Sequence, residues 1–196
     1  MARKKSIKLA AQQFEKFCNE LSEYILEAEK HLGKKHISWS YEYGIIRLYS
    51  EFENLVLECL IGAVNNDTAI LSQTTGYLFP LHLTDEVCRY LVVGNNYFDF
   101  KGRDGLIKTL KMYLPENHYL VIITKKTDYK DTLEKLSALR NFAAHGSDVA
   151  KRVARKAINQ KNLNSSGSWL KRQNRFKQII DKLKDLASEI KSQAPY

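Results

Sequence analysis

Apolar residues recur at intervals of three and four over most of this chain, which is the spacing of one buried face of an α-helix. The pattern is longest over residues 8–32, 40–64 and 168–193, and shorter copies cover 84–94 and 106–114. Long segments of helical period joined by polar breaks are typical of helices packed on helices. The sequence therefore predicts an all-α fold, an antiparallel helical bundle that forms one domain of 196 residues.

Two segments lack a clear helical period. Residues 74–83 hold Gly76 and Pro80 among apolar residues, and this composition favours a loop or a short strand pair. Residues 119–124 are almost continuously apolar, so they could form a strand or a buried helical turn. A turn-rich connector is expected over 95–105. The predicted bundle therefore carries one irregular insertion.

The positive charge of the chain is concentrated in one segment. The formal net charge is +9, from 31 basic and 22 acidic residues. Residues 149–180, the basic strip, hold nine Lys or Arg residues and no acidic one, so the remaining basic and acidic residues balance. Such a strip favours a polyanionic partner, although a solvated basic face has the same composition. We expect four residues of the strip to contact RNA: Lys151, Arg152, Arg155 and Lys156.

The three cysteines, Cys18, Cys59 and Cys88, are widely spaced in helical or apolar surroundings. They are interpreted as reduced thiols in the core, and not as disulfides or metal ligands. No apolar run is long enough for a signal peptide or for a bilayer span. We therefore expect a cytoplasmic protein that does not enter a membrane.

The helix predicted to end at Gly146 carries the most informative polar residues. At 100° per residue, its apolar stripe faces the core, whereas Asn141 and His145 lie stacked on the opposite face beside Ala138. Arg140 lies between the two faces. A cation beside a titratable imidazole suits a scissile phosphate. A purely structural alternative is a helix end at which His145 favours the dipole and Gly146 supplies a left-handed exit.

The hexapeptide Arg140-Asn-Phe-Ala-Ala-His145 resembles the Arg-x4-His motif of HEPN domains, including the Asn that often follows the Arg. The resemblance implies a helical homodimer whose paired motifs form a metal-independent endoribonuclease site, without a cofactor. Many HEPN members are toxins or act in defence against phage. By this resemblance, Arg140 and His145 are catalytic and Asn141 supports them. A Tyr often follows two residues after the His in members with a nucleotidyltransferase antitoxin, and Ser147 departs from that pattern.

The same residues suit RNA cleavage on chemical grounds. RNA supplies its own nucleophile, the 2′-hydroxyl, so the protein needs an acid, a base and a group that stabilises the phosphorane. Histidine can act as acid or base near neutral pH, and arginine can bind two phosphate oxygens at once. One chain supplies one such histidine, so a two-fold dimer through the motif helix is attractive, with Ala138 and Ala144 allowing close approach. A regulatory or antitoxin protein is a possible further partner.

Two other functions agree with the sequence. A HEPN-like module could bind nucleic acid or a nucleotide without cleaving it. Alternatively, the chain could be a helical scaffold whose protein partner docks on the C-terminal helix.

The remaining polar residues are given structural roles. His31 and His36 lack neighbouring ligands, so a metal site there is not expected. Gly102–Gly105 resembles a phosphate-binding loop, but a turn in which Asp104 caps the next helix is favoured.

Other residues near predicted helix starts and faces are also interpreted as structural. Trp39 and Trp169 are expected to anchor the core. Glu51, Glu53 and Glu58 could project toward the motif helix, although most helical glutamates are solvated.

Overall fold

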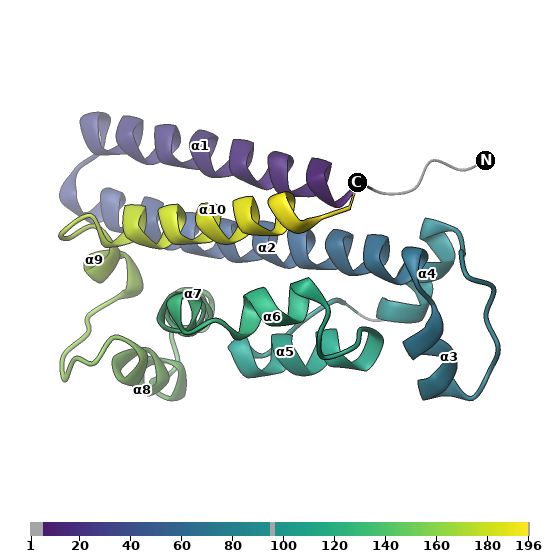
Figure 1. The fold of residues 1–196 in the computed structure, drawn as a ribbon. Helices are drawn as coiled ribbons and strands as arrows, with labels where there is room; N and C mark the ends of the chain where they lie inside the picture. Colours follow the sequence, from purple (N-terminus) through teal and green to yellow (C-terminus); the bar gives the residue numbers. More distant parts are fainter. Residues whose placement is uncertain (1–5, 95–96, 196) are drawn as a thin grey trace.

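The computed structural model describes residues 6–94 and 97–195, and within these ranges it contains ten α-helices and no strand (Figure 1). The predicted all-α bundle is therefore confirmed. The helices are α1 (Ile7–His31), α2 (Lys34–Asn66), α3 (Ala69–Thr75), α4 (Asp85–Val93), α5 (Gly102–Tyr113), α6 (Tyr119–Lys125), α7 (Thr127–His145), α8 (Asp148–Ala157), α9 (Ser166–Leu170) and α10 (Arg175–Gln193).

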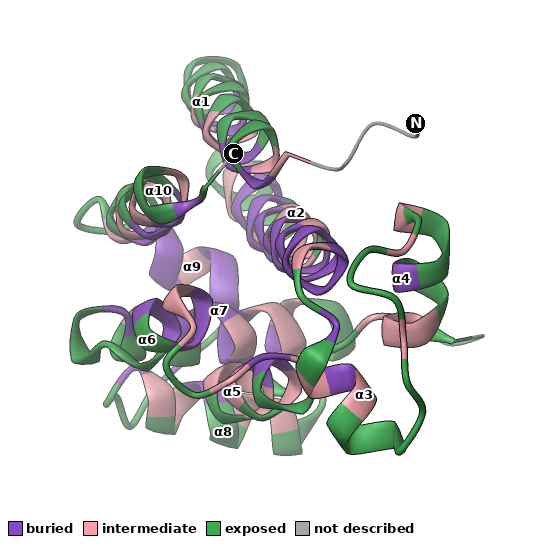
Figure 2. Ribbon diagram, turned by 45° about the vertical axis from the view of Figure 1, so that its right-hand side comes forward, coloured by how far each residue is buried: buried purple, intermediate pink, exposed green. Residues whose placement is uncertain are grey.

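The long helix α2 forms the centre of the bundle. It packs against α1 on one side and against α7 and α9 on another, and α10 lies along α1 (Figure 1). Because α2 is covered on several sides, most of its second half is buried (Figure 2). Phe52 contacts Phe14 of α1 and the ring of Phe100, with centroid separations of 6.0 and 5.8 Å. Leu133, Leu136 and Leu139 of the motif helix α7 belong to the same core, which holds α7 against α2.

Several helix ends follow local sequence signals. Thr84 caps α4 by accepting a hydrogen bond from the N–H of Val87, and Gly94 ends the helix. Gly146 ends α7 in the left-handed conformation, with φ of 60°. Both ends agree with the sequence prediction.

Three predictions need correction or completion. Residues 119–124 belong to α6, so the helical alternative is the right one. Of the two alternatives at 74–83, the loop is the right one for the residues after Gly76, while α3 extends to Thr75. In the connector over 95–105, residues 95–96 lie outside the described part of the chain, and α5 already begins at Gly102.

The predicted single helix over 168–193 is wrong at its start. The chain forms the short helix α9 up to Leu170, and α10 begins only at Arg175. Gln173 and Asn174 between them have positive φ values of 56° and 55°, which an α-helix cannot contain. The buried helix α9 packs against α2 and α7, and α10 then leaves to pack along α1.

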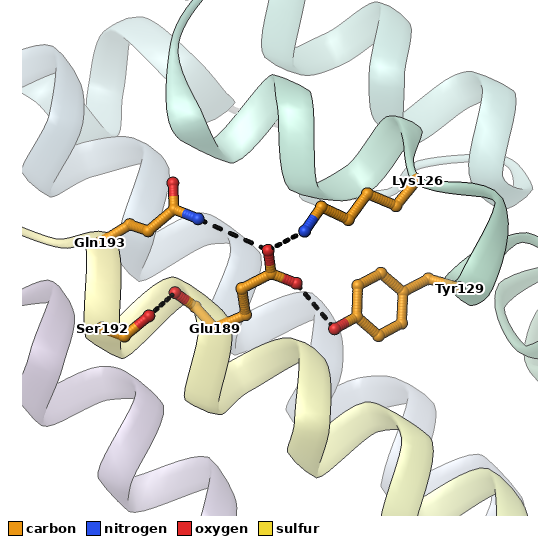
Figure 3. Close-up of polar contacts among 5 residues, drawn as sticks. All are labelled: Lys126, Tyr129, Glu189, Ser192 and Gln193. Carbon is orange, nitrogen blue, oxygen red and sulfur yellow. Dashed lines mark hydrogen bonds and ion pairs between the residues drawn. The ribbon is translucent and has the colours of Figure 1, made fainter.

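Polar contacts around Glu189 tie α10 to the start of the motif helix (Figure 3). The carboxylate accepts a hydrogen bond of 2.8 Å from the Tyr129 hydroxyl and pairs with the Lys126 ammonium. Burial works to raise the pKa of Glu189, but the hydrogen bonds from Lys126 and Tyr129 outweigh it, and the pKa is lowered. These contacts hold the N-terminal end of α7, opposite to the end that carries His145.

The three cysteines are buried and unpaired, as predicted. Burial raises the pKa of Cys18 and Cys59 to about 12 and that of Cys88 to about 11. These thiols are therefore poor nucleophiles. Among the described residues, no single helix is long and apolar enough to cross a bilayer; α2 and α3, bent by 90°, pass this test only as a pair.

Candidate active site

A tight turn at the end of α7 builds one wall of the candidate site. The Gly146 N–H donates to the Phe142 carbonyl at 3.0 Å, and the Ser147 hydroxyl then caps α8 by accepting from the N–H of Ala150. As a result α8 folds back against α7. The predicted exposure of Ala138 is wrong, because this residue is only 5% exposed. Ala138, Asn141 and His145 lie on one face, which lines a groove between the two helices.

The Arg140 guanidinium is held in place by two neighbours. Its central carbon lies 4.4 Å from the centroid of the Tyr49 ring, and its Nη1 donates to Asn141 Oδ1 at 2.8 Å. Tyr49 is itself fixed, because its hydroxyl donates to the Phe100 carbonyl at 2.9 Å inside the core. A stacked cation of this kind gains about 0.5–2 kcal/mol. Asn141 therefore orients Arg140.

An open groove of about 790 Å³ brings the three motif residues together. Arg140, Asn141 and His145 line it, and α8 and the first turn of α5 complete its walls. His145 is exposed, and Arg140 and Asn141 are half-buried. The other lining residues are Tyr49, Asp99, Lys101, Gly102, Arg103, Asp104, Glu134, Ser137, Ala138, Ser147, Val149, Ala150, Val153, Lys156 and Ala157.

A second hollow of about 540 Å³ lies on the α2 side of Arg140. Glu53 lines it, and Arg140 and Asp99 line both this hollow and the groove. One carboxylate oxygen of Glu53 is buried without a hydrogen-bond partner among the described residues. Burial raises the pKa of Glu53 to about 7, while the Arg140 charge opposes this rise and Asp99 adds to it. A titrating carboxyl therefore lies beside the motif arginine.

The other two glutamates considered for this position lie elsewhere. Glu51 pairs with Arg47 at 2.9 Å, and Glu58 pairs with Arg89. Glu53, by contrast, interacts electrostatically with Arg140.

Glu53→Gln is expected to change the pH dependence of stability. Between the ordinary glutamate pKa of 4.5 and about 7, the folded chain keeps a proton on Glu53 that the unfolded chain has lost. The contribution of Glu53 to the free energy of unfolding therefore falls as the pH rises through this range. The Gln variant should gain stability relative to the parent chain at about pH 8 compared with about pH 5.

Urea denaturation of both proteins at the two pH values measures this difference. Glu51→Gln is the matched control on the same helix, and it should not gain stability at the higher pH because its carboxylate pairs with Arg47. If the free energies of unfolding of Glu53→Gln and the parent chain differed by the same amount at both pH values, the raised pKa of Glu53 would be contradicted.

The predicted RNA-binding residues of the basic strip do not all reach the groove. Lys156 lines it, but Lys151, Arg152 and Arg155 are not among the residues that line it. The groove also contains three carboxylates, Asp99, Asp104 and Glu134, beside its cations. The charge of the groove is therefore mixed, and Lys156 is the one Lys or Arg of the basic strip among its lining residues.

Residues 102–105 form the first turn of α5 at the edge of the groove, and not a separate loop. Asp104 lies within this turn, and the N-cap is Lys101, so the predicted capping role of Asp104 is wrong. Arg103 is turned toward α6, where its Nη2 donates to the Lys125 carbonyl at 2.5 Å. The positive end of the α5 dipole thus lies at the groove.

The remaining histidines lie away from the groove. His31 contacts Glu27 at 3.4 Å at the end of α1, and the His36 ring lies 5.1 Å from that of Trp39. Over residues 6–94 and 97–195, no group of three or more His, Cys, Asp or Glu side chains could hold a metal ion.

Sequence reasoning missed Tyr49 as a partner of Arg140, and it left the position of Glu53 open. Both lie on α2, far from the motif in sequence. Tyr49 falls within the apolar stripe of its helix and Glu53 outside that stripe, so their local patterns carry no sign of Arg140. Only the packing of α7 across α2 brings them to it.

No protein-family model, no curated protein and no solved structure matches this chain. The motif and its geometry therefore carry the functional argument alone.

Proposed function

We propose that this protein is a metal-independent endoribonuclease of the HEPN type, which cleaves RNA by attack of the 2′-hydroxyl on the neighbouring phosphate. The observation that carries the proposal is the fixed Arg140 guanidinium, stacked on Tyr49 and bonded to Asn141, in an open groove that His145 also lines. A positioned cation and an accessible imidazole are the two groups that this reaction needs most.

Each motif residue has a chemical role in this proposal. Arg140 binds the non-bridging oxygens of the phosphate and stabilises the charge of the phosphorane. Asn141 accepts from Arg140 and so fixes the direction of the guanidinium. His145 transfers the proton, either from the 2′-hydroxyl or to the leaving 5′-oxygen. A concerted reaction needs a second proton-transfer group at the other oxygen.

A homodimer would supply that second group, and we propose that two motif regions meet across a two-fold axis. Because Ala138 is buried, such a contact would involve the exposed end of α7 and the exposed valines of α8. Val149 and Val153 are 61% and 49% exposed and line the groove. A role as a toxin or in phage defence, with a restraining partner protein, belongs to the same proposal.

Arg140→Lys is expected to lower the rate of RNA cleavage by about 10- to 100-fold. Lysine keeps the charge but cannot bind two oxygens in a plane, and a charge-assisted hydrogen bond contributes about 1.5–3 kcal/mol. Cleavage of a labelled single-stranded RNA under single-turnover conditions measures the effect. Arg47→Lys on α2 is the control, because Arg47 pairs with Glu51 outside the groove. Full activity of Arg140→Lys would argue against bidentate binding.

The proposal is tested by incubating the purified protein with labelled single-stranded RNA in excess EDTA, beside Arg140→Ala and His145→Ala. Cleavage by the parent chain alone supports it. The net charge of +9 favours a second function, a nucleic-acid-binding module without activity. RNA binding without cleavage by any of the three proteins would support that function instead.

A further inference from the structure

Trp39, near the start of α2, lies on the surface of the protein. Its side chain is 54% exposed, whereas Trp169 of α9 is only 7% exposed. Trp169 therefore anchors the core as predicted, but the same prediction is wrong for Trp39. Core packing does not explain a tryptophan at an exposed position. The residues around Trp39 therefore indicate what it could bind.

Two basic neighbours on the same helix flank the Trp39 ring. The Lys35 ammonium lies 5.0 Å from the ring centroid, and the His36 ring lies 5.1 Å from it. These contacts order the indole while leaving more than half of it accessible. An ordered, exposed aromatic ring beside cations is the usual platform for an unpaired base.

The basic strip reaches this place from the other end of the chain. The Lys171 ammonium donates to Ser38 Oγ at 2.8 Å and to the Lys34 carbonyl at 3.2 Å. Both acceptors are uncharged, so the positive charge of Lys171 is not neutralised by them. The close packing of α9 on α2 at Gly167 fixes this arrangement.

The segment around Trp39 holds basic residues and no acidic one. Residues 32–41 contain Lys34, Lys35 and His36 and no Asp or Glu, and the basic strip has none either. The nearest acidic residues in sequence, Glu29 and Glu42, lie outside the segment, where Glu29 accepts a hydrogen bond from the Tyr41 hydroxyl and Glu42 accepts one from the N–H of Gly167. The surface formed by Lys34, Lys35, His36, Trp39 and Lys171, the Trp39 surface, is therefore positive.

We propose that the Trp39 surface binds single-stranded RNA, with one base stacked on the indole and the phosphates beside Lys35 and Lys171. The inference deepens the proposed function, on which it rests, because it names the single-stranded form as the substrate class. A duplex keeps its bases stacked inside the helix and cannot offer one to Trp39. The cations favour nucleic acid over an apolar protein partner at this place.

Fluorescence can test the proposal directly, since the chain has only two tryptophans and Trp169 is buried. The probe is a single-stranded 2′-O-methyl oligouridylate of roughly 12 nucleotides, which lacks the nucleophile and cannot be cleaved. We expect it to quench the emission of the parent chain with a steep salt dependence. Trp39→Phe should lose the quenching but keep most of the affinity, because phenylalanine can still stack.

Trp39→Ala should weaken binding of the labelled probe by roughly 5- to 100-fold, the contribution of one stacked base. Tyr90→Ala is the matched control. Tyr90 is 62% exposed on α4, which packs near the opposite end of α2 from α9 (Figure 1). The affinity of Tyr90→Ala for the probe should equal that of the parent chain, and circular dichroism should show that both variants are folded.

Unchanged affinity of Trp39→Ala, equal losses in both variants, or equal affinity for a duplex of the same length would overturn the proposal. The outcome is independent of cleavage, because the probe cannot be cut. An inactive protein that still quenches with this probe would remove the proposed nuclease function and leave the binding surface in place.

Discussion

Replacing His145 by alanine is expected to lower the rate of RNA cleavage by about 10²- to 10⁴-fold, the usual contribution of a proton-transfer group. The imidazole is exposed at the end of α7 and shares the groove with Arg140. Its removal leaves the stacked guanidinium in place, since Tyr49 and Asn141 hold Arg140 without help from His145. RNA affinity should therefore change little, and the loss should fall on the chemical step.

His31 provides a close control for this variant. It is the last residue of α1, as His145 is the last residue of α7, and it is also exposed. His31→Ala also removes an imidazole at a helix C-terminus, but His31 lies outside the groove. We expect its cleavage rate to match that of the parent chain. Equal losses in the two variants would mean that His145 acts on helix stability and not on catalysis.

Gly167→Ala is expected to destabilise the fold by about 3 kcal/mol or more, at the upper end of the range for overpacking. A methyl group at this position would lie 1.8 Å from the carbonyl oxygen of Ser38 and 2.7 Å from its carbon. Both atoms belong to the backbone of α2, so they cannot move aside as a flexible side chain would. The helix α9 must therefore shift away from α2.

This shift would also break contacts on the other side of α9. The Ser166 hydroxyl, which is fully buried, donates to the Leu139 carbonyl of the motif helix at 2.8 Å. An unpaired buried hydroxyl adds to the cost. Loss of α9 packing would disturb both α7 and the Trp39 surface, because Lys171 follows directly after α9.

Urea denaturation measures the loss, with Gly33→Ala as the control. Gly33 precedes α2, has a φ of −70°, and has no atom within 4 Å of the position of an added methyl group. Its substitution should change the free energy of unfolding by about 0.5 kcal/mol or less. A Gly167→Ala protein as stable as Gly33→Ala would show that α9 does not depend on close contact with α2.

The features of the fold that depend only on residues close together in the sequence were predictable from it. The helical period identified α1 and α2, and Thr84, Gly94 and Gly146 marked helix ends because capping is a local interaction. The break between α9 and α10 was missed, although five polar residues, 171–175, interrupt the apolar pattern between Leu170 and Phe176. Such a polar stretch also occurs on the exposed face of a continuous helix, and it is the packing of α9 against α2 and α7 that accompanies the positive φ values of Gln173 and Asn174.

The candidate site likewise has a part that was predictable from the sequence and a part that was not. Helix geometry alone places Arg140, Asn141 and His145 within two turns of α7, and the structure brings all three to one groove. The burial of Ala138 was missed because α8 folds back on α7. The stacking of Arg140 on Tyr49 and the approach of Glu53 depend on contacts between distant segments, which the periodicity of either segment does not encode.

The most direct test of the central claim is the chemical identity of the RNA ends formed by the purified protein in excess EDTA. Attack by the 2′-hydroxyl, assisted by His145 and Arg140, predicts a 2′,3′-cyclic phosphate on one product and a 5′-hydroxyl on the other. Both ends should be absent with His145→Ala and present with His31→Ala. Products with 3′-hydroxyl and 5′-phosphate ends, or no cleavage by the parent chain, would contradict the account.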